Sequence, residues 1–398
     1  MKRLLEIIGF MLSRLSKLFG NILSMFIRLR LPVKKRRVMF WAYNFKQYSC
    51  NPRYVSDYLL ENYPQYEIYW VFRKNIDTSS IDKRIKCIKL YSWQYFLLVN
   101  SAEFLITNAR TDPYQIYWHK RAGQKYIMLW HGGIALKKIE RDVEQVLGFS
   151  YLQKAKKDSK VCNVMVSGCT MQTNLIKEKF WYSGEVLEKG IPRNDIFFNL
   201  DLHSKIREKV YSYYNIPKQN RILLYAPTFR RNGSIEPYKI EWGRVITYVK
   251  KMLNSSDITV LLRLHPNLIN KVDTTPLLNS PEVIDVTKYH DMQELLCISD
   301  ILITDYSSSM FDFSMLNRPC ILYATDAEKY DRGYYFSLSE LPFPMAHNQD
   351  ELVSIIDSFD NNQYQQSINH FFRDTVGLFE DGQASKALCE WIVSHSIQ

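Results

Sequence analysis

Residues 301–312 read Ile301-Leu302-Ile303-Thr304-Asp305-Tyr306-Ser307-Ser308-Ser309-Met310-Phe311-Asp312. A short apolar run enters an acidic, hydroxyl-rich loop, and apolar residues at helical spacing follow. This order predicts a buried strand, a turn and a helix, which is the repeating unit of an α/β sheet. Serine hydroxyls and unpaired N–H groups at a helix start favour an anion, so a phosphate site is one interpretation. The alternative is ordinary N-capping by Ser307 or Asp305.

Ten further runs along the chain resemble this strand. They are short, β-branched or aromatic, and without polar alternation, as expected for strands buried on both faces of a parallel sheet. The first group is Val38–Tyr43, Glu67–Phe72, Lys86–Leu90, Phe104–Thr107, Lys125–Trp130 and Asn163–Ser167. The second group is Arg221–Tyr225, Thr259–Leu264, Val283–Val286, Ile301–Thr304 and Cys320–Tyr323. Longer connections between the strands predict right-handed βαβ units.

The two groups of strands predict two doubly wound, Rossmann-type α/β domains that face a common cleft. A chain of 398 residues with 46% hydrophobic residues is long enough to bury two cores. The predicted ranges are 1–36 for an N-terminal helix and basic stretch, 37–200 for the first domain and 201–398 for the second. Ligands of such folds bind at the carboxyl ends of the strands.

The positive charge of the chain is concentrated at its N-terminus. The formal net charge is +11, and residues 1–37 hold ten basic side chains and one acidic side chain. The remainder carries 42 basic and 40 acidic residues and is therefore nearly neutral. A nucleic-acid-binding protein would carry its basic stripe on the folded body, so no nucleic acid is expected as a partner.

Residues 3–28 have the pattern of an amphipathic helix, with polar and apolar residues on opposite faces. No uncharged run reaches the ~20 residues of a membrane-spanning helix, and the pattern does not fit a signal peptide. With Lys34-Lys35-Arg36-Arg37 behind it, the helix predicts in-plane attachment to an anionic membrane surface. The alternative is a helix packed on the body or at a dimer interface, which leaves a homo-oligomer open.

Neither a metal nor a cofactor is expected. The seven cysteines are scattered, their number is odd, and no pair has the tight spacing of a zinc or redox site. Reduced thiols in a cytoplasmic setting are the simpler interpretation. No cluster of His, Cys and carboxylates has metal-ligand spacing, and neither a Walker A motif nor a dinucleotide-binding glycine motif occurs.

Four more motifs occur where loops of such a fold meet a ligand. Residues 130–133 (WHGG) let an imidazole and bare backbone approach a substrate, although a turn with an incidental histidine is the alternative. Residues 225–231 (YAPTFRR) supply a hydroxyl and guanidinium groups suited to phosphate. Residues 262–266 (LRLHP) place a second histidine at a strand end, and residues 190–195 (GIPRND) add a turn with an arginine. Together they could position and neutralise a phosphoryl group.

In this order and spacing, the motifs resemble those of the CDP-glycerol glycerophosphotransferase family, the teichoic acid primases and polymerases. The resemblance covers roughly residues 100–340. It rests on His131-Gly132-Gly133 with Lys137-Lys138, Pro192–Asp195, Ala226–Arg230, His265-Pro266, Thr304–Ser308, Asn317–Pro319, Glu328–Asp331 and Arg332–Phe336. Each piece is weak by itself, but the combination is specific.

The resemblance implies a GT-B fold, peripheral attachment at the cytoplasmic side of the cell membrane, and a CDP-glycerol or CDP-ribitol donor that releases CMP. The acceptor would be a hydroxyl of a lipid-linked teichoic acid or capsular glycan, and the donor is a substrate rather than a cofactor. By the resemblance, His131 is the general base and His265 the second catalytic histidine. The donor-phosphate set is Thr228, Arg230, His265, Asp305, Ser307 and Ser308. Further cleft candidates are Gly132, Arg193, Asn194, Asp195, Lys329 and Arg332.

Two positions depart from the family pattern, so the pattern does not decide whether the polyol of the donor is glycerol or ribitol. Gly133 stands where the family usually has threonine, and Ser337 stands where aspartate often follows the aromatic run. The chain lacks the extra N-terminal region of the long polymerases, so a primer or side-branch transferase is expected. Two alternatives are a GT-B glycosyltransferase that uses a nucleotide sugar and a non-catalytic assembly component of the same fold.

Overall fold

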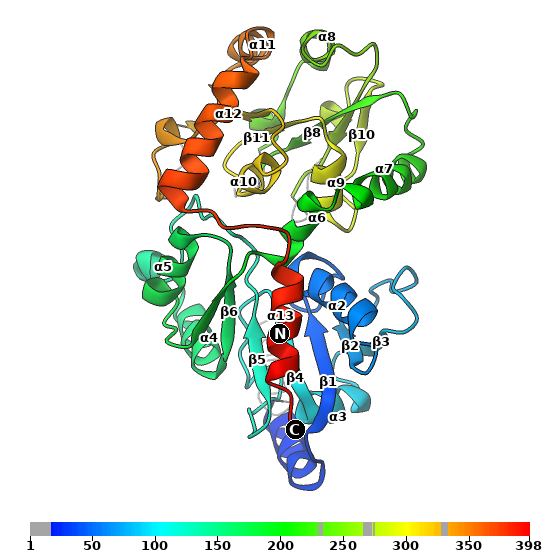
Figure 1. The fold of residues 1–398 in the computed structure, drawn as a ribbon, viewed down its shortest axis with the longest axis vertical. Coiled ribbons are helices and arrows are strands. Elements are labelled where there is room, and N and C mark those ends of the chain that lie inside the picture. The colour runs from blue at the N-terminus through cyan, green and yellow to red at the C-terminus, as the bar shows by residue number, and fades with distance from the viewer. Residues whose placement is uncertain (1–16, 229, 231–233, 266–272, 274, 328–332) are drawn as a thin grey trace, which may run out of the picture.

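The computed structural model describes residues 17–228, 230, 234–265, 273, 275–327 and 333–398. Figure 1 shows two α/β bodies stacked along the long axis of the molecule. Each body is built on one parallel sheet, and helices cover the faces of both sheets. The prediction of two doubly wound domains is therefore confirmed.

The first sheet has seven strands in the order β3-β2-β1-β4-β5-β6-β7. Their bounds are β1 (Lys34–Trp41), β2 (Glu67–Phe72), β3 (Lys86–Lys89), β4 (Ala102–Thr107), β5 (Lys125–Met128), β6 (Val164–Ser167) and β7 (Glu185–Glu188). All residues of β4 and β6 are buried, which explains why these runs show no polar alternation. Sequence analysis missed β7, because this edge strand is short, partly exposed and flanked by glutamates.

The second sheet has six strands in the order β10-β9-β8-β11-β12-β13. Their bounds are β8 (Arg221–Ala226), β9 (Ile258–Leu262), β10 (Val283–Asp285), β11 (Ile301–Thr304), β12 (Cys320–Tyr323) and β13 (Met345–Ala346). The central pair β8 and β11 is aligned from Leu223 opposite Ile301 to Ala226 opposite Thr304. The carboxyl ends of both strands are therefore level with each other, and the loops that follow them lie side by side. The two-residue β13 was not predicted, because so short a run has no recognisable pattern.

The helices alternate with the strands. Their bounds are α2 (Cys50–Asn62), α3 (Trp93–Ser101), α4 (Phe149–Val161), α5 (Thr170–Lys179), α6 (Asp195–Phe198), α7 (Leu200–Tyr214), α8 (Trp242–Met252), α9 (Met292–Ile298), α10 (Ser309–Ser314), α11 (Gln349–Asp357), α12 (Asn361–His370) and α13 (Ala384–Ser394). The short helix η2 (Pro192–Asn194) precedes α6, and a π-helical turn, η8 (Phe371–Val376), follows α12.

The last helix returns to the first domain. In α13, Leu388, Trp391 and Ile392 belong to the same hydrophobic cluster as Val38 and Phe40 of β1. Figure 1 shows α13, in red, lying across the strands of the lower body. The predicted range 201–398 thus ends in a helix that packs on the first domain.

A helix over residues 17–30 packs on the first domain through a mixed face, in which Gly20, Ser24 and Ile27 are buried. The hydroxyl of the buried Ser24 donates to the carbonyl of Tyr117 at 2.6 Å and accepts from the amide of Asn100 at 3.1 Å. A methyl group built on Gly20 would lie 2.5 Å from the Tyr117 ring, so only glycine allows this close approach. The part of the predicted helix before residue 17 lies outside the described residues.

The opposite face of this helix is apolar and exposed. It presents Leu18, Phe19, Ile22, Met25, Phe26 and Leu29, with exposed fractions from 42% to 74%. The basic stretch behind the helix forms the first half of β1, so the first domain begins before the predicted residue 37, and Arg37 pairs with Glu67 at 2.8 Å. Over the described residues, no helix combines the length and apolar character needed to cross a bilayer.

Candidate active site

The predicted motifs lie on loops at the carboxyl ends of strands, where the two domains meet. His131 follows β5 of the first domain, while Thr228 and Ser307 follow β8 and β11 of the second. A methyl group built on Gly132 would lie 4.0 Å from the Ser308 hydroxyl, so the two loops face each other at short range. The sheet topology thus gathers residues separated by some 180 positions.

His131 is held as a neutral acceptor that faces this junction. Its ring is accessible to solvent, and Nδ1 lies 3.2 Å from the carbonyl oxygen of Asn108. Because a carbonyl can only accept, the proton resides on Nδ1 and Nε2 is left with its lone pair. Partial desolvation by the surrounding protein, and to a lesser degree the charge of Arg193, lower the pKa of His131 to about 4, against the Asn108 hydrogen bond. The imidazole is therefore neutral at physiological pH.

The residue before His131 has a strained backbone conformation. Trp130 has a φ of 52°, in the left-handed region that bulky residues rarely adopt. Its ring centre lies 4.3 Å from that of His131 and packs edge-on against Phe180. The His131 ring thus packs beside Trp130, which Phe180 holds from its other side.

Arg193 lies behind the histidine loop rather than in the open cleft. The side chain is buried, and Nη1 donates to the carbonyl oxygen of His131 at 2.6 Å. Nη2 donates at 2.6 Å to Asp312 on α10, which also accepts from Gln293. One guanidinium group therefore connects the predicted base to the helix that follows the serine loop.

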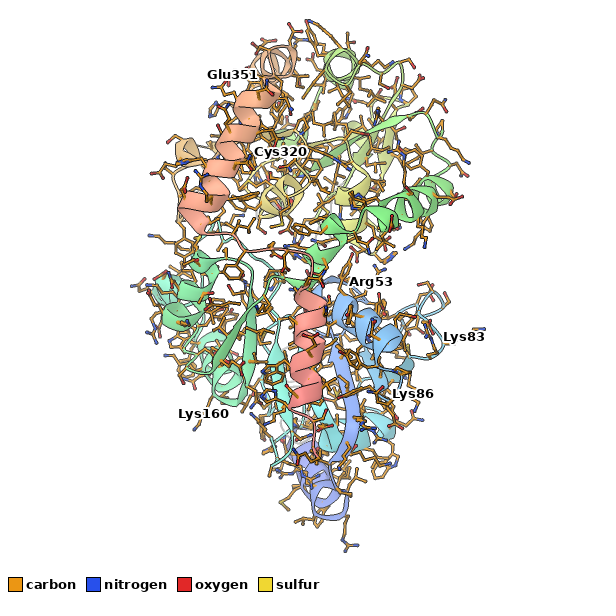
Figure 2. All side chains as sticks on the ribbon, in the orientation of Figure 1. Arg53, Lys83, Lys86, Lys160, Cys320 and Glu351 are labelled. Carbon is orange, nitrogen blue, oxygen red and sulfur yellow. The ribbon has the colours of Figure 1, made fainter. Side chains whose placement is uncertain are left out.

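A second arginine connects the domains beside this contact. Arg53 on α2 pairs with Asp291 at 2.7 Å and with Glu294 at 2.8 Å, both at the start of α9. Figure 2 shows Arg53 at the junction of the two bodies. Sequence analysis missed this clamp, because Arg53 follows no predicted strand and its partners are more than 230 residues away.

The loops after β8, β11 and β12 are connected through Arg230. Its guanidinium donates to Asp326 through Nε and Nη2 and to Thr228 through Nη1, and it lies 2.9 Å from Asp305. Asp305 in turn accepts from the Thr228 amide at 2.8 Å. The network shapes the predicted donor loop from behind, and direct phosphate contacts by Arg230 stay a prediction. Asp326 was missed, although its position just after β12 is a recognisable signal.

The serine loop provides hydroxyls rather than a strong helix dipole. The helix α10 contains only six residues, so its dipole is small. Ser308 occupies the N-cap position without a side-chain cap hydrogen bond, while the Ser307 hydroxyl accepts from the Ser309 amide at 3.3 Å. The Ser308 hydroxyl thus takes no part in capping and lies beside Gly132.

His265 lies where cationic groups from both domains converge. The imidazole is exposed after β9, and partial desolvation together with the charges of Lys137 and Arg263 lowers its pKa. Lys137 belongs to the histidine motif of the first domain, and its backbone forms an antiparallel bridge with Tyr334 of the second. The arrangement gathers positive charge where a pyrophosphate would need it.

Two predicted cleft residues serve the returning chain instead. The Asn194 amide donates to Glu380 at 3.1 Å, and Asp195 accepts from the amides of Ala384 and Ser385 at the start of α13. A role for Asn194 and Asp195 in the cleft therefore stays a prediction without a contact that supports it.

The remaining predictions concern Lys329, Arg332 and bound groups. Lys329 and Arg332 lie outside the described residues. Within the described ranges, no three His, Cys, Asp or Glu side chains come together as a metal site would require.

Comparison with protein families gives one match that spans most of the chain. A family model described as CDP-Glycerol:Poly(glycerophosphate) glycerophosphotransferase matches residues 23–394. A teichoic acid glycerol-phosphate transferase from Staphylococcus aureus is 32% identical over 90% of this chain and 93% of its own length. A teichoic acid poly(glycerol phosphate) polymerase from Staphylococcus epidermidis is 31% identical over 90% of this chain, which spans about half (51%) of that relative.

Solved structures give the same result for the fold. The wall teichoic acid polymerase TagF superposes with a TM-score of 0.80 at 28% sequence identity, covering 97% of each chain. The similarity thus extends over both domains and the junction that carries His131.

Proposed function

Because the chain belongs to the CDP-glycerol:poly(glycerophosphate) glycerophosphotransferase family, we propose that it transfers a polyol phosphate from a CDP-polyol to a hydroxyl of a lipid-linked glycan. The donor is CDP-glycerol or CDP-ribitol, and the products are CMP and a phosphodiester. TagF has been soaked with CDP-glycerol, which supports the choice of donor class. One observation carries the proposal: a neutral imidazole, His131, faces the hydroxyl loop of the opposite domain.

In the reaction, Nε2 of His131 accepts the proton of the acceptor hydroxyl. The hydroxyl oxygen attacks the β-phosphorus of the donor and forms a new O–P bond. The bond between the β-phosphorus and the bridging oxygen breaks, and its electron pair leaves with CMP. No covalent enzyme intermediate is needed, because positioning and charge neutralisation supply most of the catalysis in phosphoryl transfer.

The second domain stabilises the departing phosphate. Ser307 and Ser308 offer hydroxyls to the pyrophosphate, His265 offers an N–H donor, and Lys137 of the first domain adds positive charge. Arg230 and Asp305 keep the Thr228 loop in place beside them. These groups act most strongly on the negative charge that grows on the leaving CMP.

The enzyme works at the cytoplasmic face of the cell membrane as a peripheral protein. Support comes from the helix over residues 17–30, whose exposed side is apolar while Ser24 on its other side is hydrogen-bonded to the body. An in-plane helix of this kind would insert its apolar residues among the lipid head groups, beside a lipid-linked acceptor. The acceptor is a teichoic acid or capsular glycan, extended as a primer or side branch.

The deciding experiment measures CMP release from CDP-glycerol and from CDP-ribitol, each with a lipid-linked disaccharide acceptor. Acceptor-dependent CMP from one donor supports the proposal and identifies the polyol. A His131→Ala preparation controls for contaminating hydrolases. Release of UDP from a nucleotide sugar instead would establish a glycosyltransferase, and acceptor binding without any release would establish a non-catalytic component.

A further inference from the structure

Two adjoining pockets open at the carboxyl ends of β2 and β3, to one side of the active-site junction. One has a volume of about 240 Å³ and the other about 330 Å³, and both are lined by Arg73 and Lys74. Lys89 lines the larger pocket, while Leu90 and Tyr91 line the smaller one. We name this pair the basic pocket. It lies at the same carboxyl end of the first sheet as the His131 loop. Parallel sheets of this kind bind their ligands at that end.

The lining of the basic pocket is strongly cationic. It includes three cations and, among its described lining residues, no carboxylate. Neither Lys74 nor Lys89 takes part in an ion pair with any described residue, whereas Lys86 on the same strand as Lys89 pairs with Glu67. Arg73 is anchored by donation from Nε to the carbonyl of Asn44 at 2.8 Å. Anchored guanidinium and ammonium groups of this kind suit a phosphate.

An aromatic rim connects the basic pocket to the exposed helix. Tyr91 and Trp93 are 52% and 60% exposed. The ring of Tyr91 contacts that of Tyr117 at 5.4 Å, and Tyr117 is the residue on which Gly20 of the helix packs. A ligand with an apolar tail on the helix would therefore pass Tyr91 before its polar part reaches the cations.

A short turn connects the basic pocket to the catalytic histidine. The Arg73 amide donates to the carbonyl of Phe45 at 2.8 Å, and its side chain holds Asn44. Tyr43, Asn44 and Phe45 have φ values of 44°, 57° and 68°, a left-handed turn that needs such support. The ring of Tyr43 lies 6.2 Å from the ring of His131. Apolar helix, basic pocket and predicted base thus follow one another in space.

We propose that the basic pocket binds the phosphate of the acceptor, between the membrane-facing helix and His131. The inference rests on the proposed function. A lipid-linked glycan carries its phosphate next to the apolar chain and its reacting hydroxyl at the far end of the sugars. The phosphate therefore needs a site that lies aside from the base and towards the membrane, which is where Lys74 and Lys89 stand. An anionic phospholipid head group offers the same phosphate chemistry and is the competing source.

The test uses the double variant Lys74→Ala/Lys89→Ala in the full-length protein. The matched control is Lys83→Ala/Lys160→Ala, which removes the same charge from two exposed lysines of the first domain that project into solvent on opposite flanks in Figure 2. Thermal unfolding of both verifies that they fold. Calorimetric titration with geranyl pyrophosphate, in excess CDP to occupy the donor cleft, measures binding to the pocket without catalysis. The KM for acceptor and for CDP-polyol, and sedimentation with phosphatidylglycerol vesicles, complete the set.

We expect the Lys74/Lys89 variant to bind geranyl pyrophosphate roughly tenfold more weakly and to raise the acceptor KM to a similar degree. The KM for CDP-polyol should not change in this variant. The control variant should keep the values of the unaltered protein in all of these measurements. Loss of vesicle binding alone, with prenyl pyrophosphate binding and acceptor KM intact, would assign the pocket to phospholipid head groups and overturn the proposal. Absence of binding by the unaltered protein would also overturn it. If neither CDP-polyol releases CMP, the proposed function fails, but the calorimetry still measures binding to the basic pocket. Failure of the proposed function can therefore be distinguished from failure of the pocket proposal.

Discussion

Arg193 of the first domain and Asp312 of the second form a buried ion pair, with Nη2 and Oδ2 2.6 Å apart. The same guanidinium holds the main-chain oxygen of His131. One side chain thus contributes both to the junction between the domains and to the placement of the predicted base.

We expect Arg193→Ala to lower the free energy of unfolding by about 3–5 kcal/mol, because it leaves the Asp312 carboxylate buried without its partner. Urea denaturation measures the loss. The matched control is Arg221→Ala, which removes an exposed partner of Asp300 and should change stability by less than about 1 kcal/mol. Equal losses in the two variants would contradict a special role for the buried pair.

The base assignment predicts different defects for the two histidines. His131→Ala should lower kcat by ~10²–10⁴-fold, since it removes the acceptor for the hydroxyl proton, while CDP-polyol binding persists. His265→Ala should weaken donor binding as well. Turnover and equilibrium donor titration separate the two effects. Near-normal turnover of His131→Ala would show that another group is the base.

The pH profile follows from the environment of His131. Crowding by the protein lowers the pKa of His131 to about 4, so the neutral, proton-accepting form persists as the pH falls from 8 towards 5. The acidic limb of kcat/KM should therefore lie well below the value near 6.5 of an ordinary histidine. A profile measured over the pH range of stable folding checks this, and a limb centred near 6.5 would show that the ring is not desolvated when it reacts.

Membrane attachment should depend on the apolar face of the helix over residues 17–30. Phe19→Ser with Phe26→Ser is expected to reduce co-sedimentation with anionic vesicles severalfold, because it removes two exposed rings that would insert. Leu200→Ser is the control, since Leu200 is 74% exposed but lies on α7 of the other domain. Figure 1 places α7 far from the helix at the lower end of the molecule. An equal effect of the control would indicate nonspecific hydrophobic adhesion.

The returning segment carries a pH-dependent contact at Glu380. Burial raises the pKa of Glu380 to about 8, and its carboxyl accepts from the Ile191 amide at 3.0 Å and from Asn194. The folded state therefore holds a proton that the unfolded state releases near pH 4.5. The contribution of Glu380 to the free energy of unfolding is fully present below about pH 4.5, and it is lost as the pH rises towards 8.

The Glu380→Gln variant tests this directly. It should lose less stability than the unaltered protein between pH 5.5 and pH 8, because glutamine cannot ionise. Urea midpoints at three pH values measure the difference. Parallel curves for the two proteins would place the origin of any pH dependence elsewhere.

Much of the fold was readable from local pattern. The strands Glu67–Phe72 and Ile301–Thr304 were predicted with their observed bounds, because buried parallel strands are uninterrupted apolar runs that end at polar loops. The same rule indicated His131 and Ser307, since functional loops follow the carboxyl ends of strands. Of the four edge strands, β3 and β10 were predicted, whereas β7 and β13 were missed, because a short run between two glutamates and a two-residue strand show little apolar pattern.

The sequence by itself determined most of the strands in their order, the loops that carry the predicted site residues, and the amphipathic character of the first helix. Only the tertiary structure decided which partners those groups meet: Arg193 with Asp312, Arg230 with Asp326, and Lys74 beside Lys89 in one pocket. It also decided that Gly20, Ser24 and Ile27 of the helix face the body. The physical reason is range, because periodicity reports burial within a few residues, whereas these contacts depend on how separate segments pack: Arg193 meets Asp312 at a separation of 119 residues and Arg230 meets Asp326 at 96.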